Sequence, residues 1–373
     1  MDAGIYVHVP FCVRKCHYCS FNSVPYSKNI AEEYLHALLA EIERFEQDVR
    51  PVSLYIGGGT PTVLPQDVLL RLIRAVYAKF SIKEGTEATL EANPGTLDNM
   101  DLAELGDAGI NRVSLGVQSF DPAELSMLGR LHGRGEVDKS VDRCRSAGIG
   151  NVSLDLIYSL PGQDPGKWSE SLRHAVSLSP EHISLYDLSV EAGTKLHAEV
   201  KAGRLALPPE TKSAEMYLHA VEFLEERGFR RYEISNFARP GYECRHNLGY
   251  WSSGEYAGFG AGAHSHIGGR RIMNVEDVRG YVGAVKSGGP AAASAEVIGG
   301  AEREREFVML ALRKADGFSL EEYETRFGTS FLGRRGGAAE RLAGAGYITL
   351  EGGRVRLTLS GVLASNAVIC EFF

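Results

Sequence analysis

The sequence predicts an α/β protein: an incomplete parallel barrel of six strand–helix units, then an irregular α+β extension and a small winged-helix-like domain. Short runs of small and β-branched residues alternate with longer helical patterns over the first 230 residues, which is typical of βαβ units. The pattern then becomes irregular and rich in aromatic residues and glycine, before three helical stretches and a hairpin end the chain. We therefore expect domains at residues 1–230, 231–302 and 303–373.

Each predicted strand is a near-continuous apolar run, as expected for a sheet that is covered on both faces. The strands are expected at residues 5–9, 53–56, 88–91, 112–117, 152–157 and 182–186. Helices are expected near 30–49 and 66–80 and after each later strand. Asp121, Pro122 and Glu124 fit an N-cap, a first-turn proline and an N3 carboxylate, so a helix begins there.

The last domain is predicted from helical patterns that precede a strand–turn–strand pattern. The helices are expected near 304–314, 319–327 and 335–345, and the hairpin at 347–359. Ser319 and Glu322 fit a capping box at the second helix. The domain has ten Lys+Arg and nine Asp+Glu. A DNA-reading winged helix should be more basic than this, so the sequence favours a protein contact or a lid.

Charge and hydropathy exclude several functional classes. The net charge of −8 disfavours a primary nucleic-acid interface, which needs several cations on phosphates. No apolar stretch approaches the roughly 18 residues of a membrane span, and the N-terminus lacks a signal pattern. The sequence therefore predicts a cytoplasmic protein in a reducing compartment. Peripheral membrane contact and a homodimer both stay compatible with it.

Three cysteines stand close together after the first strand. Cys12, Cys16 and Cys19 form C-x3-C-x2-C, and the other three cysteines are scattered, which disfavours a disulfide framework. Three thiolates with one open position suit an iron–sulfur cluster. A structural zinc site that includes His8 or His17 is the alternative, because zinc closes its tetrahedron with four ligands.

The other polar motifs also fall at the ends of predicted strands. Gly57–Pro61 follows the second strand, Glu91–Pro94 the third and Gln118 the fourth, while Asp155 lies within the fifth. The carboxyl ends of parallel barrel strands carry the active site. We therefore expect these residues and the cysteine loop to meet.

Together these residues resemble the radical S-adenosylmethionine superfamily. The evidence is the cysteine motif with Tyr18 before its last cysteine, followed by Gly-Gly-Gly-Thr-Pro at a strand end. The resemblance covers essentially the whole chain and narrows to the branch of oxygen-independent coproporphyrinogen III oxidase. The stretches that carry this are His8–Cys12, Gly116–Phe120, Leu128–His132 and Asp155–Gly162.

The resemblance implies two cofactors. The three cysteines would bind three irons of a [4Fe-4S] cluster, and the methionine moiety of S-adenosylmethionine would chelate the fourth iron. Gly58, Gly59 and Thr60 would contact that moiety, and Glu91 and Asp155 the ribose hydroxyls. The whole set of implied S-adenosylmethionine contacts is Tyr6, Tyr18, Gly58, Gly59, Thr60, Glu91, Gln118, Arg130 and Asp155.

Two departures from the oxidase pattern point to another function. Phe21 stands where the oxidase has a further cysteine, and His246–Trp251 reads H-N-x-x-Y-W. Both features resemble the haem chaperone (HemW-type) subgroup, which implies haem as a ligand and haem-requiring proteins as partners. His246 is a candidate haem ligand. In the alternative, this segment is structural and His246 makes a hydrogen bond. Other candidate ligands are Cys244, His264 and His266.

Two further functions stay open. The first is the oxidase reaction itself, which removes two propionate carboxyls from coproporphyrinogen III and needs cations around a tetracarboxylate, with Arg230, Arg231 and Arg245 as candidates. The second is radical modification of RNA, which the net acidity disfavours. The sequence does not determine whether S-adenosylmethionine is cleaved or only bound.

Overall fold

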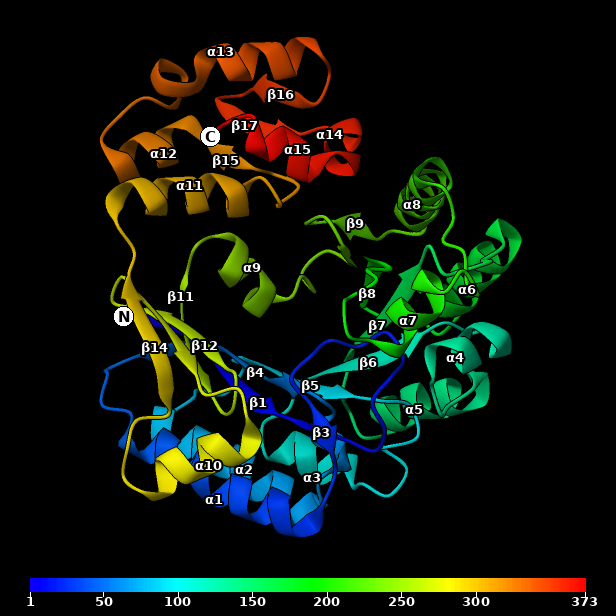
Figure 1. Cartoon of the computed structure of the whole chain (residues 1–373), viewed down its shortest axis with the longest axis vertical. Helices are drawn as coiled ribbons and strands as arrows, with labels where there is room; N and C mark the ends of the chain where they lie inside the picture. The colour runs from blue at the N-terminus through cyan, green and yellow to red at the C-terminus, as the bar shows by residue number, and fades with distance from the viewer.

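One mixed sheet of twelve strands forms the centre of the computed structural model, which describes residues 1–373 (Figure 1). Six neighbouring strands run parallel, each paired with the next in chain order. They are β1 (Asp2–Val9), β4 (Arg50–Gly58), β5 (Glu87–Ala92), β6 (Arg112–Gln118), β7 (Asn151–Tyr158) and β8 (His182–Asp187). The predicted incomplete barrel of six strand–helix units is confirmed.

The interior of the barrel is polar, which the apolar appearance of the strands did not indicate. Arg112 donates to the Thr89 hydroxyl at 3.4 Å, and Ser153 bonds the His182 ring at 2.7 Å, with all four side chains buried. Apolar residues on the opposite side of each strand pack against the helices. Buried polar groups need partners, so the interior is organised by hydrogen bonds.

Helices cover the outer face of the barrel, as Figure 1 shows. They are α1 (Lys28–Arg44), α2 (Gln66–Phe80), α3 (Leu102–Asp107), α4 (Pro122–Leu128), α5 (Arg134–Ser146), α6 (Pro165–Ser177), α7 (Lys195–Lys201) and α8 (Glu210–Glu225), with a 3-10 turn at Pro61–Val63. The Asp121 carboxylate caps α4, as predicted, by accepting from two backbone amides. The first helix ends five residues before the predicted position, because Phe45 leaves the helix to pack against Phe80 and Phe259.

The segment after residue 230 continues the same sheet at both edges. On one side, β10 (Asn236–Ala238) pairs antiparallel with β8, and β9 (Arg230–Arg231) pairs antiparallel with β10. On the other, β11 (Glu255–Phe259) pairs parallel with β1, and β12 (His264–Ile267), β13 (Arg270–Asn274) and β14 (Ala292–Val297) follow antiparallel. Between them lie α9 (Arg245–Trp251) and, after β13, α10 (Val278–Lys286). The sheet therefore has no break at the predicted boundary between residues 230 and 231.

The C-terminal unit has its own three-stranded sheet and an aromatic core. Its elements are α11 (Gly300–Ala311), β15 (Phe318–Ser319), α12 (Leu320–Phe327), α13 (Phe331–Gly344), β16 (Ile348–Glu351), β17 (Arg354–Leu357), α14 (Leu359–Leu363) and α15 (Ser365–Cys370). Ser319 caps α12 by accepting from the Glu322 amide at 2.9 Å. The two last helices were not predicted, and they carry Phe372 onto Phe331 in this core.

The C-terminal unit docks on α9 and its neighbouring loops (Figure 1). The Ala315 amide donates to the Tyr232 carbonyl at 2.9 Å, and Arg326 donates to the carbonyls of Ser252 and Ser253. None of the helices is long and apolar enough to cross a membrane.

The extension is held to the barrel by Glu41 of α1. Its carboxylate accepts from the Gly260 amide at 2.8 Å and from Asn274 at 2.7 Å, and Tyr281 also donates to it. We expect Glu41→Ala to lower the free energy of unfolding by about 2–4 kcal/mol, because three buried donors lose their acceptor. Urea unfolding measures this. The control is Glu43→Ala, at an exposed position of the same helix, and an equal loss in both variants would contradict the prediction.

Candidate functional site

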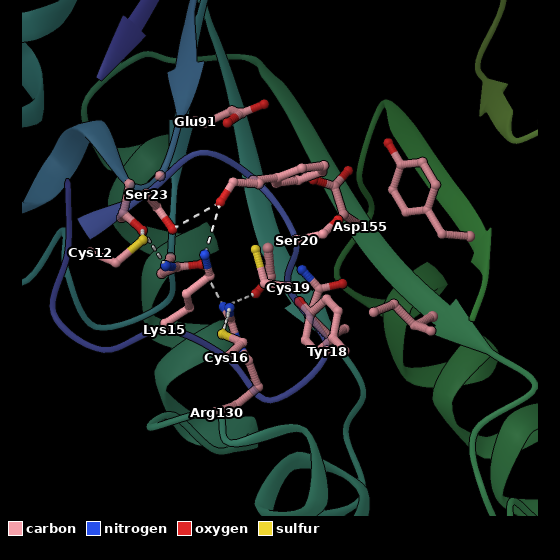
Figure 2. Close-up of a pocket in the computed structure, with 18 of the residues that line it drawn as sticks. Cys12, Lys15, Cys16, Tyr18, Cys19, Ser20, Ser23, Glu91, Arg130 and Asp155 are labelled. Atoms are coloured by element: carbon pink, nitrogen blue, oxygen red, sulfur yellow. Dashed lines mark hydrogen bonds between the residues drawn. The ribbon is translucent and has the colours of Figure 1, made fainter. Parts of the chain in front are cut away.

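A cavity of about 430 Å³ lies at the carboxyl ends of the barrel strands, where the sequence predicted the site. Figure 2 shows the three cysteine thiols on one side of it, with Glu91 and Asp155 beyond them. The strand-end motifs and the cysteine loop therefore meet. The residues that line the cavity are Cys12, Arg14, Lys15, Cys16, Tyr18, Cys19, Ser20, Phe21, Ser23, Gly58, Gly59, Thr60, Glu91, Ala92, Asn93, Ser114, Gly116, Gln118, Arg130, Asp155, Ile157, Tyr186, Asp187, Leu188, Ser189 and Glu191.

The cysteine loop is closed by a small parallel pair of strands, β2 (Phe11–Cys12) and β3 (Val24–Pro25). Thr60 donates to Cys12 Sγ at 3.7 Å, and Arg130 donates to Cys16 Sγ at 3.3 Å. Burial raises the pKa of the Cys12 and Cys19 thiols. The thiols therefore need a positive partner to ionise, which a bound iron–sulfur cluster supplies.

The zinc alternative does not fit this geometry. His8 is engaged through both ring nitrogens, by the Tyr6 hydroxyl and the Asn22 carbonyl, each at 2.9 Å. His17 bonds the Met127 carbonyl at 2.8 Å and contacts Lys195. No three His, Cys, Asp or Glu side chains, the three cysteines included, are grouped so that they could hold a single metal ion. Neither histidine is therefore free to complete a zinc site with the thiols.

Gly58 and Gly59 are required by the backbone around them. Gly58 has a φ of +118°, and a Cβ there would lie 2.6 Å from His8. A Cβ at Gly59 would lie 2.6 Å from the Phe11 carbonyl oxygen. No larger residue fits at either position, so these glycines leave the wall of the cavity as bare backbone.

The Glu91 carboxylate is held at both oxygens. The Tyr55 hydroxyl donates to Oε1 at 2.7 Å, and the Gly58 amide donates to Oε2 at 3.0 Å. Burial raises the pKa of Glu91 to about 7, although both hydrogen bonds act to lower it. Its charge therefore changes near neutral pH.

Asp155 is held by three serine hydroxyls. Ser184 donates to it at 2.7 Å, Ser114 at 3.1 Å and Ser153 at 3.4 Å. Burial raises the pKa of Asp155, and these hydrogen bonds counter part of the shift. Asp155 and Glu91 thus form a pair of oriented acceptors in the wall of the cavity.

Arg130 is the cation beside the cysteines. Its guanidinium donates to Asn93, to the Gly116 carbonyl and to Cys16, while its Nε has no partner. Asn93 in turn donates to the Thr60 hydroxyl at 2.7 Å. A buried nitrogen without an acceptor is unusual in proteins and suits an anionic ligand at this point.

Eight of the nine predicted S-adenosylmethionine contacts line the cavity. Gln118 does so from a strained backbone, with a φ of +68° at the end of β6, a feature that clusters at functional sites. Tyr6 is the exception: it does not line the cavity but lies below it, bonded to His8. The reason is its place inside β1, before the strand end.

The sequence missed part of the cavity wall. Lys15, Tyr186, Asp187 and Glu191 also line it. Tyr186 and Asp187 end β8, the sixth parallel strand, so the strand-end rule that found the other motifs could have found them.

His246 does not line the cavity and lies on α9. Its ring is 3% exposed and bonds Ser53 Oγ at 2.8 Å and the Tyr250 hydroxyl at 2.9 Å. Burial, and then the charge of Arg112, lower the pKa of His246 to about 3. Both ring nitrogens are occupied, so the structural alternative fits His246 and direct ligation of haem does not. Cys244 is buried beside it, and His264 is exposed.

Comparison with known proteins agrees with this geometry. The profile of the radical SAM superfamily matches residues 6–175, and that of the HemN C-terminal domain matches residues 300–364. The haem chaperone HemW of Bacillus subtilis is 38% identical over 98% of each chain, and HemW of Mycobacterium tuberculosis is 36% identical over 98% of this chain and 93% of that protein. This chain belongs to the HemW family of the radical SAM superfamily.

A solved structure and a eukaryotic relative extend the comparison. Coproporphyrinogen III oxidase (HemN) from Escherichia coli superposes with a TM-score of 0.86 over 100% of this chain and 90% of that chain, at 22% identity, which shows the fold. The mitochondrial radical S-adenosyl methionine domain-containing protein 1 of Bos taurus is 39% identical over 71% of this chain and 61% of that protein.

Membership of the superfamily implies a [4Fe-4S] cluster and S-adenosylmethionine, and the residues present fit both. Three cysteines line one cavity, and the two histidines near them are hydrogen-bonded elsewhere. The glycine wall, the unpartnered Arg130 Nε and the two carboxylates suit a ligand that carries both charged and hydroxyl groups.

We expect Cys16→Ser to abolish cluster binding, because a hydroxyl does not replace a thiolate on iron. Iron content and the visible absorption after anaerobic reconstitution measure this. Cys370→Ser is the matched control, since Cys370 is exposed and outside the cavity. Retention of a full cluster by Cys16→Ser would refute the assignment.

Proposed function

We propose that this protein is a haem chaperone that holds a [4Fe-4S] cluster and S-adenosylmethionine, binds haem, and delivers it to haem-requiring proteins. The observation that carries the proposal is the relationship to proteins named haem chaperone HemW over 98% of the chain.

Phe21 separates this function from the oxidase alternative. It is 68% exposed and lines the cavity where the oxidase pattern has a further cysteine. The arginines suggested for a tetracarboxylate, Arg230, Arg231 and Arg245, lie on β9 and α9, and none lines the cavity. Both observations favour the chaperone over the oxidase.

Within the cavity, the chain's own side chains would position the cofactors. Cys12, Cys16 and Cys19 would hold the cluster, which supplies one-electron chemistry when bound. Backbone groups of Gly58 and Gly59 would approach the methionine moiety closely, while Arg130 offers a donor to its carboxylate. Glu91 and Asp155, both labelled in Figure 2, would accept hydrogen bonds from the ribose hydroxyls.

We also propose a cytoplasmic location. All six cysteines are unpaired, as is usual in a reducing compartment. The net charge of −8 gives no support to nucleic acid as a partner.

The protein is expected to bind about one haem per chain and to transfer it to an apoprotein that requires haem. Difference spectra on titration with haem, followed by incubation with an apo-acceptor, measure both steps. An unrelated protein of equal net charge is the control. Binding no tighter than to that control would refute the chaperone function.

Anaerobic incubation with coproporphyrinogen III is expected to give no protoporphyrinogen. An authentic oxidase assayed beside it is the positive control. Product formation at a comparable rate would favour the oxidase function instead.

S-adenosylmethionine affinity is expected to fall as the pH falls through about 7. Burial raises the pKa of Glu91 to about 7, so its carboxylate is ionised above that pH and neutral below it, and an ionised acceptor binds hydroxyls more strongly. Calorimetric titration between about pH 6 and about pH 8 measures the change. Glu91→Gln should bind weakly at every pH, and a pH-independent wild type would contradict the role of Glu91.

A further inference from the structure

Helix α9, which carries H-N-x-x-Y-W, closes the barrel at the amino ends of its strands. Glu87, the first residue of β5, accepts from the backbone amides of Arg245 at 2.9 Å and His246 at 3.0 Å. This carboxylate is 8% exposed. The start of α9 is therefore fixed to the start of a barrel strand, below the cavity.

His246 points from α9 into the barrel interior. Its two ring nitrogens are bonded to Ser53 on β4 and to Tyr250 on α9 itself. Its ring stacks on Tyr55, with centroids 5.1 Å apart and planes 28° apart. A Cβ at Gly4 would lie only 3.1 Å from this ring. Two hydrogen bonds, the Tyr55 ring and the backbone at Gly4 therefore fix the position of the imidazole.

Tyr55 connects His246 to the cavity. Its ring stacks on the His246 imidazole, and its hydroxyl donates to Glu91 Oε1 at 2.7 Å. A Cβ at Gly57 would lie 2.8 Å from the same carboxylate. Tyr55 thus holds one oxygen of Glu91, the Gly58 amide holds the other, and the His246 ring packs against Tyr55.

A second set of contacts runs from His246 to the cysteine loop. Tyr6 lies 6.4 Å from the His246 ring and 6.2 Å from the Tyr55 ring. Its hydroxyl bonds His8 at 2.9 Å, and His8 bonds the carbonyl of Asn22 at 2.9 Å, three residues after the last cysteine of the loop. Tyr6 therefore connects His246 with the cysteine loop, although it does not line the cavity itself.

We propose that His246 is a positioning residue for the S-adenosylmethionine site, acting through Tyr55 on Glu91 and through Tyr6 and His8 on the cysteine loop. The H-N-x-x-Y-W helix is then the floor of the cofactor site and not the haem site. The inference rests on the proposed binding of S-adenosylmethionine in this cavity.

The first test is Tyr55→Phe in the reconstituted holoprotein. The change removes one hydroxyl and keeps the ring, so the fold and the stacking on His246 are retained. We expect calorimetric titration to show S-adenosylmethionine binding about tenfold weaker, with cluster content and haem affinity unchanged. Tyr217→Phe is the matched control: it removes a buried hydroxyl that bonds the Ile234 carbonyl at 2.7 Å, outside the cavity.

The pH profile separates positioning from simple loss of stability. Tyr55 and the Gly58 amide lower the pKa of Glu91, against burial and the charge of Asp155, while Arg112 lowers it further. Without the Tyr55 hydroxyl, the pH at which affinity is half lost should rise by about half a unit or more. An unchanged midpoint in Tyr55→Phe would overturn the inference.

His246→Gln and His246→Leu test whether His246 itself affects the S-adenosylmethionine site. Glutamine can still bond Ser53 and Tyr250 and should keep most of the S-adenosylmethionine affinity, whereas leucine should lose about tenfold. Haem affinity should be unchanged in both. Loss of haem binding with normal S-adenosylmethionine binding would overturn the inference and make His246 a haem ligand. If the wild type binds no S-adenosylmethionine, the proposed function fails at that point, independently of these variants.

Discussion

The neutralisation of one buried cation, Arg112, organises the interior of the barrel. Its side chain is 2% exposed, and its guanidinium donates to the Thr89 hydroxyl at 3.4 Å. Burial disfavours its charge, but the neighbouring groups, Cys244 and Tyr55 first and then Glu87, outweigh this and keep its pKa raised. In return Arg112 lowers the pKa of Glu91 and Asp155, against the effect of burial. A buried charge is destabilising without an opposite charge nearby, so Arg112 and these carboxylates favour each other's charged forms.

The carboxylates of Glu87, Glu91 and Asp155 lie at different heights along the barrel and have different roles. Glu87 holds the helix that closes the floor, while Glu91 and Asp155 face the cavity. Between these levels, the contacts are hydrogen bonds and ring stacking. A buried polar network fixes the direction of each member, because every unmade bond is costly. A polar interior therefore transmits the position of α9 to the cofactor site, which a core of aliphatic side chains would do less specifically.

The C-terminal unit belongs to the floor and does not cover the cavity. It contacts α9 and the loops beside it, and no residue beyond Glu191 lines the cavity. The expected lid role is therefore wrong for this structure. The cavity is lined instead by the cysteine loop, with Phe21 and Lys15, and by the chain after β8.

The sequence by itself determined the barrel, its helices and most of the cavity wall. These follow from local patterns: alternation of strand and helix, the spacing of Cys12, Cys16 and Cys19, and polar residues at strand ends, which parallel topology brings together. Only the tertiary structure decided the roles of Tyr6 and His246. From the sequence, the histidine of a short motif such as H-N-x-x-Y-W is equally compatible with a ligand and with a core residue. Its role depends on Ser53 and Tyr55, nearly two hundred residues earlier in the chain, and on burial that arises only when α9 closes the barrel.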